Sequence, residues 1–92
     1  MKIARTNELL LVNYLKSRPF LATEKRIQHG IQFTTASGVI VNFYYKGKFP
    51  DVVTIDVQRD AANIEEADMI RHFAGSLAIA EQEEPVDSWN WN

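Results

Sequence analysis

Cysteine is absent from the 92-residue chain, and long apolar runs are absent as well. Without cysteine the protein has no disulfide and no thiolate ligand for a metal, so its stability has to come from a packed core. The longest apolar runs, such as residues 9–12, are far shorter than the roughly 20 residues that span a bilayer, so we expect no membrane segment. Apolar residues make up 46% of the chain, which is enough for the core of one small domain.

A secretory leader is not recognisable in the first residues, MKIARTNELLLVNYLK. Asn13, Tyr14 and Lys16 interrupt the apolar part, and no small-x-small cleavage site follows it. Nothing in the composition requires an oxidising compartment. We therefore expect a soluble cytoplasmic protein, and we expect it to be a monomer.

Charge is distributed unevenly along the chain, although the total is only −2. Residues 1–48 carry eight cations against two carboxylates, a net charge of +6, and residues 49–92 carry two cations against ten carboxylates, a net charge of −8. Such asymmetry is typical of proteins with charged partners. It is also compatible with two halves that pair with each other across the fold and leave a mixed surface.

Helical spacing of apolar residues occurs near both ends of the chain. The first helix is expected to begin near Asn7, a favourable N-cap residue, and to end before Pro19. The second is expected to follow Asn63, because Glu66 stands three residues later as in a capping box and apolar residues then recur at helical spacing.

Three segments between the helices have apolar residues at every second position, the alternation of half-buried strands. They are residues 25–35, 39–45 and 52–57. These elements predict an α+β fold of order α-β-β-β-α, in which two helices pack on one face of a three-stranded antiparallel meander. The opposite face of that sheet would carry polar side chains and remain open to solvent or a partner.

The domain is expected to comprise residues 1–80, followed by an acidic tail that contains tryptophan at residues 81–92. Acidic residues around the second helix and the two tail tryptophans form a candidate surface for a protein partner. Its residues are Asp60, Glu65, Glu66, Asp68, Trp89 and Trp91. Acids at the start of a helix are also favoured by the helix dipole alone, and the tryptophans could equally fold back onto the sheet.

Enzymatic constellations are not recognisable. Asp68 and His72 stand four residues apart on the second helix, but a metal site needs at least a third ligand and none is near in the pattern. No serine has a neighbouring His–acid pattern, and the glycines at 38 and 47 lie in expected hairpin turns, not in a phosphate-binding loop. We expect a protein that is not an enzyme and has no cofactor.

A basic and aromatic cluster is the stronger candidate for binding. Lys46 and Lys48 flank a turn beside Tyr44, and in a three-stranded meander Lys25 and Arg26 would reach the same edge of the sheet. Cations beside an aromatic side chain on a sheet are suited to a nucleic-acid backbone or unpaired bases. The alternative is that these lysines only keep a hairpin turn soluble.

The α-β-β-β-α order resembles that of the double-stranded-RNA-binding domain. In that family the second helix begins with lysines that contact phosphates, whereas here it begins RDAANIEEADMI. Carboxylates at that place would repel duplex RNA. The resemblance therefore covers the order of elements and not the binding motif.

Two stretches, MKIARTNELLLVNYLKSRPF and GVIVNFYYKGKFPDVV, together with the short length and acidic end, resemble the small anti-CRISPR proteins of phages, in particular inhibitors of the type I-F surveillance complex. The resemblance implies a non-enzymatic inhibitor in the host bacterial cytoplasm that docks on a complex of Cas proteins and guide RNA and blocks either access of target DNA or recruitment of the nuclease. On this hypothesis the basic cluster contacts the guide-RNA backbone and the acidic surface engages lysines of Cas subunits. The alternatives are a stand-alone RNA- or DNA-binding module and a small phage structural or assembly protein.

Overall fold

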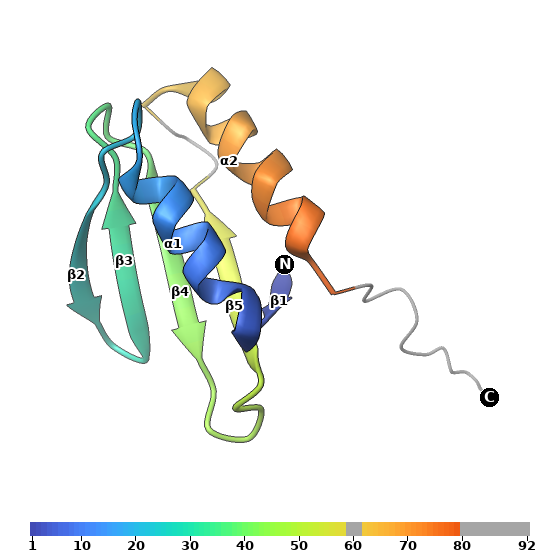
Figure 1. Cartoon of the computed structure of the whole chain (residues 1–92). Coiled ribbons are helices and arrows are strands. Elements are labelled where there is room, and N and C mark those ends of the chain that lie inside the picture. Colours follow the sequence, from blue (N-terminus) through green and yellow to red (C-terminus); the bar gives the residue numbers. More distant parts are fainter. Residues whose placement is uncertain (59–61, 80–92) are drawn as a thin grey trace.

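The computed structural model describes residues 1–58 and 62–79, which form a five-stranded antiparallel sheet and two α-helices (Figure 1). Along the chain the elements are β1 (Lys2–Ala4), the 3-10 turn η1 (Arg5–Asn7), α1 (Glu8–Lys16), β2 (Thr23–Ile27), β3 (Gly30–Thr34), β4 (Ile40–Tyr45), β5 (Val52–Val57) and α2 (Ile64–Leu77). The strand order in the sheet is β1-β5-β4-β3-β2. Strands β2 to β5 thus form a meander, and β1 adds to its β5 edge.

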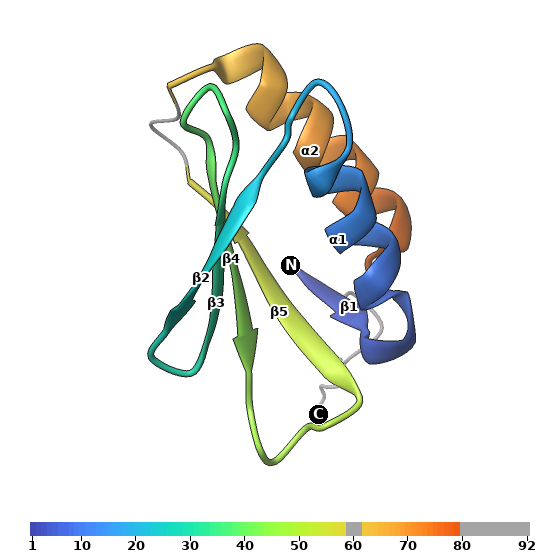
Figure 2. The ribbon, with the colours of Figure 1, turned by 60° about the vertical axis from the view of Figure 1, so that its left-hand side comes forward.

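Both helices lie on the same face of the sheet (Figure 2). They bury Leu11 and Leu15 of α1 and Ile70 of α2 in one core with Phe33 and Phe43 of the sheet. Each fully buried side chain of this size contributes about 1.5–3 kcal/mol relative to an exposed one. No helix of the described residues covers the other face, and none is long and apolar enough to cross a membrane.

The mixed α+β class is confirmed, but the prediction of three strands is wrong in two places. The segment 25–35 is a hairpin of two strands, β2 and β3, which turns at Gln28 and His29. His29 has a φ of 66°, a left-handed conformation for which hairpin turns usually use Gly or Asn. Because a histidine occupies this position, the sequence before Gly30 did not indicate a turn. The other strand that was missed is β1, which at three residues is too short to show a period.

The helix boundaries follow the predictions closely. Asn63 caps α2, since its Oδ1 accepts a hydrogen bond of 3.1 Å from the Glu66 backbone N–H. Asn7 precedes α1 as expected and is the last residue of η1, but its side chain makes no capping bond. The predicted tail at residues 81–92 lies outside the described residues.

The end of the described chain returns to β1. Ala78 forms a bridge with Ile3, and the Ile79 N–H donates to the Lys2 carbonyl at 2.8 Å. The segment after α2 therefore lies along the outer edge of β1 and shields part of it.

Gly30 lies where β3 closely approaches the backbone of β4. A Cβ built on Gly30 would lie 1.9 Å from the Phe43 carbonyl oxygen of β4, whereas one built on Gly47 would meet nothing within 4 Å. We expect Gly30→Ala to lower the free energy of unfolding by about 3 kcal/mol, since the backbone of β3 or β4 has to shift.

Gly47→Ala is the matched control, and we expect it to change stability by less than about 0.5 kcal/mol. Urea unfolding of both variants measures the difference. Equal stability of the two would contradict the close approach of β3 and β4.

Candidate functional site

The uncovered face of the sheet, here called the open face, is organised in rows across the strands, because directly paired residues point to the same side. One row runs from Tyr44 of β4 through Thr54 of β5 to Lys2 of β1. The adjacent row contains Lys25, Gln32, Asn42 and Asp56. Within it, the Gln32 Nε2 donates to the Asn42 Oδ1 at 3.1 Å.

Lys25 and Arg26 do not join the other predicted basic residues. Both lie on the outer strand β2, two strands or about 10 Å from β4. Lys25 pairs with Gln32 on the open face, whereas Arg26 points to the helix side, as does Glu24, which pairs with Lys16 of α1 at 2.7 Å. The expected cluster of four cations at one edge is therefore not formed, because β2 and β3 are two strands and not one.

A cavity of about 310 Å³ opens where β1, β5 and the β4–β5 loop meet. Its lining residues are Lys2, Lys46, Phe49, Val52, Thr54 and Ile79. Lys46 was predicted as a site residue, and Lys48 is exposed on the same loop but does not line the cavity. Lys2 and Phe49 were missed, and only the register of β1 on β5 brings Lys2 to this place.

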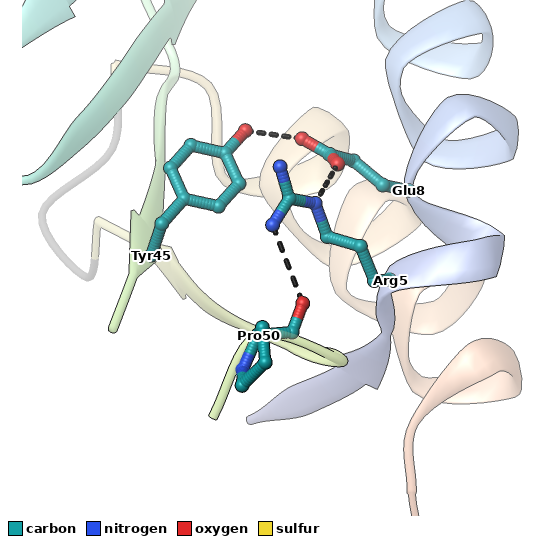
Figure 3. Close-up of polar contacts among 4 residues, drawn as sticks. All are labelled: Arg5, Glu8, Tyr45 and Pro50. Atoms are coloured by element: carbon teal, nitrogen blue, oxygen red, sulfur yellow. Dashed lines mark hydrogen bonds and ion pairs between the residues drawn. The ribbon is translucent and has the colours of Figure 1, made fainter. Parts of the chain in front are cut away.

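Arg5, Glu8 and Tyr45 form a polar cluster that fixes the base of this loop (Figure 3). The Arg5 Nε lies 2.9 Å from the Glu8 carboxylate, and the Tyr45 hydroxyl donates to the other oxygen of that carboxylate. The Arg5 guanidinium also lies 4.6 Å from the centre of the Tyr45 ring and donates to the Pro50 carbonyl at 3.4 Å. The cluster thus connects η1 and α1 to the end of β4 and to the loop.

The pKa of Tyr45 is raised well above its ordinary value. Partial burial of the phenol is the largest cause, followed by the hydrogen bond to Glu8 and the negative charge of that carboxylate. Each of these disfavours the phenolate form.

The acidic residues of α2 divide into two kinds. Glu66 is 9% exposed, and its Oε1 accepts hydrogen bonds from Thr35 Oγ1 at 2.6 Å and Ser37 Oγ at 2.5 Å, so it ties α2 to the β3–β4 turn. Glu65 and Asp68 are exposed, and Asp68 forms an ion pair with Arg71 at 3.0 Å.

Glu66 therefore has a structural role and is not exposed to a partner as predicted. Of the other residues predicted for that surface, Glu65 and Asp68 are exposed, and Asp60, Trp89 and Trp91 lie outside the described residues. Across residues 1–58 and 62–79, no group of three or more His, Asp or Glu side chains is placed to hold a metal ion.

No known protein family matches the sequence, and neither a characterised protein nor a solved structure matches the chain. The fold and the chemistry of its surfaces are therefore the basis for a functional proposal.

We expect Glu66→Ala to lower the free energy of unfolding by about 2 kcal/mol, because Thr35 and Ser37 lose a charged acceptor at a mostly buried place. Glu65→Ala removes the same charge from the same helical turn but from an exposed position, and we expect a loss of no more than about 0.5 kcal/mol. Thermal or urea unfolding compares the two. A larger effect of Glu65→Ala would contradict the structural role of Glu66.

The Tyr45 cluster predicts a specific pH dependence. Tyr45→Phe removes the hydrogen bond to Glu8, so we expect a loss of about 1 kcal/mol at neutral pH. The raised pKa means that the folded state holds the phenol proton more tightly than the unfolded state, so this stabilisation is fully present below pH 10 and declines above it.

The difference in unfolding free energy between the wild type and Tyr45→Phe isolates Tyr45 from the other groups that titrate in alkali. Urea unfolding from neutral pH to above pH 10 measures it. We expect the difference to change only above about pH 10. A difference that stays constant across this range would contradict the assignment.

Proposed function

We propose that the protein is a non-enzymatic inhibitor, acting as a monomer in the cytoplasm of a host bacterium, that binds an RNA-guided CRISPR surveillance complex and blocks access of target DNA. The observation that carries the proposal is the open face of the sheet. It carries the Tyr44 ring, the Gln32 amide, Lys2 and Lys25, with Lys46 at its border, and no described helix covers it. A surface of this composition is suited to a partner that contains nucleic acid.

The distribution of charge supports a partner made of both RNA and protein. Lys2 and Lys25 lie on the open face, where Asp56 is the acidic neighbour, and Lys46 lies at its border. The exposed carboxylates of Glu65 and Asp68 belong to α2, on the other side of the sheet.

One side of the molecule can thus approach an RNA backbone, while the other side complements basic protein surfaces that normally hold DNA. The choice of an RNA-guided complex, among assemblies of RNA and protein, comes from the resemblance to anti-CRISPR proteins. The structure supports the proposal through the two surfaces.

Lys25 and Arg26 provide a matched test, because they are adjacent, exposed and equal in charge but point to opposite sides of β2. We expect Lys25→Glu to weaken capture of a type I-F complex by about tenfold, and to weaken the block of target-DNA binding in parallel. We expect Arg26→Glu to leave both unchanged. Thermal midpoints of the two variants should agree with that of the wild type, since both side chains are exposed.

The wild-type protein itself tests the proposal in a pull-down from cells that contain the complex. Failure of any Cas protein to co-purify would refute it. Tight binding of free RNA or DNA by the isolated protein at physiological salt would instead favour a stand-alone nucleic-acid-binding module, since the proposed inhibitor also uses basic protein surfaces of its partner to bind tightly.

A further inference from the structure

The cavity beside β1 is lined by three segments that are distant in the sequence. Lys2 comes from β1, residues 46–54 of the β4–β5 loop and β5 supply most of the lining, and Ile79 follows α2. Its volume of about 310 Å³ lies at the lower end of the range of small-ligand sites.

The loop that forms one wall is held by several hydrogen bonds. The Phe49 N–H donates to the Lys46 carbonyl at 3.0 Å, and the Val52 N–H donates to the Phe49 carbonyl at 3.2 Å. On the other side of the loop, the Arg5 N–H donates to the Asp51 carbonyl at 2.7 Å. Phe49 is thus presented by a closed turn, and yet its side chain is 60% exposed. An aromatic ring that is ordered and accessible is suited to stacking.

The chemistry of the lining restricts the ligand. Two ammonium groups, from Lys2 and Lys46, and the Thr54 hydroxyl favour an anionic group, whereas Phe49, Val52 and Ile79 favour an apolar body. Among the described residues neither Lys2 nor Lys46 forms an ion pair. A ligand with a flat apolar part and an adjacent anionic group is complementary to both the cationic and the apolar side chains that line the cavity.

The cavity continues into the open face. Thr54 lies between Lys2 and Tyr44 in one row, so a second aromatic ring follows directly beside the cavity. In the next row the half-buried Gln32 amide can contact a base edge, whereas Asn42, which accepts its hydrogen bond, is only 4% exposed. Asp56 lies in that same row and repels phosphate, which confines the anionic group to the corner of Lys2 and Lys46.

We propose that this cavity binds one unpaired nucleotide of a single-stranded nucleic acid, with the base against Phe49 and its phosphate between Lys2 and Lys46, and with the next base on Tyr44. A single strand presents a phosphate beside each flat base, which suits a surface where two lysines lie near two aromatic rings. The inference rests on the proposed function for the source of the strand, which is the guide RNA or the target DNA of the complex.

The test uses the isolated full-length protein and fluorescein-labelled oligothymidylate or oligouridylate of about eight nucleotides at about 50 mM salt. We expect saturable binding, seen as a rise in fluorescence anisotropy. We expect Phe49→Ala, and separately Lys2→Gln with Lys46→Gln, to weaken it by about tenfold. With one phosphate neutralised between the two lysines, log K should fall with log salt with a slope of about −0.7, and this slope should approach zero in the double lysine variant.

Lys48→Gln is the matched control, because it removes a charge from the same loop outside the cavity, and we expect binding to be unchanged. Equal loss of binding in Lys48→Gln and in the double lysine variant would overturn the site. The site would also be overturned if the protein bound neither oligonucleotide. Binding of decanoate, an aliphatic anion, without binding of either oligonucleotide would overturn it as well.

Capture of the surveillance complex is measured in parallel, so that the two proposals are tested separately. A protein that captures the complex but binds neither oligonucleotide refutes the nucleotide site and leaves the proposed function in place. A protein that binds oligonucleotides through Phe49 and the two lysines, but captures no complex, supports the site and refutes the inhibitor.

Discussion

The pairing of β1 with β5 is the interaction on which both the fold and the candidate site depend. Ile3 of β1 is fully buried and pairs with Val53, so it completes the core on the helix side. Lys2, its neighbour, points to the open face and lines the cavity, while its carbonyl accepts the Ile79 N–H. Without β1, strand β5 would be an exposed edge, the core would open under the helices, and the cavity would lose a wall.

A strand of three residues does not hold its place by backbone hydrogen bonds alone, because ordering each residue costs about 1–2 kcal/mol. The additional stabilisation comes from Ile3 and from the cluster in which Arg5 and Glu8 contact Tyr45 (Figure 3). This cluster lies at the junction of β1, α1 and β4, and Arg5 also contacts the backbone of Pro50 in the loop. The same side chains therefore stabilise the N-terminal strand and position the segment that carries Phe49.

The sequence allowed most elements to be predicted, because long amphipathic segments show their period, but not the pairings between them. The turn at His29 was missed because its left-handed residue is neither Gly nor Asn. As a result, the predicted sheet placed Arg26 on the strand beside β4, whereas it lies on the outer strand β2. Tyr44 and Lys46 could be identified because they are neighbours in the chain. Lys2 could not, because its position depends on the register between segments about fifty residues apart, which no local pattern encodes.

The fold places the lysines of the open face and the exposed acids of α2 on different sides of the sheet. The basic N-terminal half supplies four of the five strands and the lysines on the open face, whereas α2, which follows the sheet in sequence, lies on the helix side with its acids. Glu66 shows that this separation is partly structural, since its carboxylate is used to bind Thr35 and Ser37. The exposed acids of α2, Glu65 and Asp68, lie on the other side of the sheet from the cavity. A phosphate can therefore reach the lysines of the open face without approaching α2, and the overall charge of −2 does not prevent a local anion site.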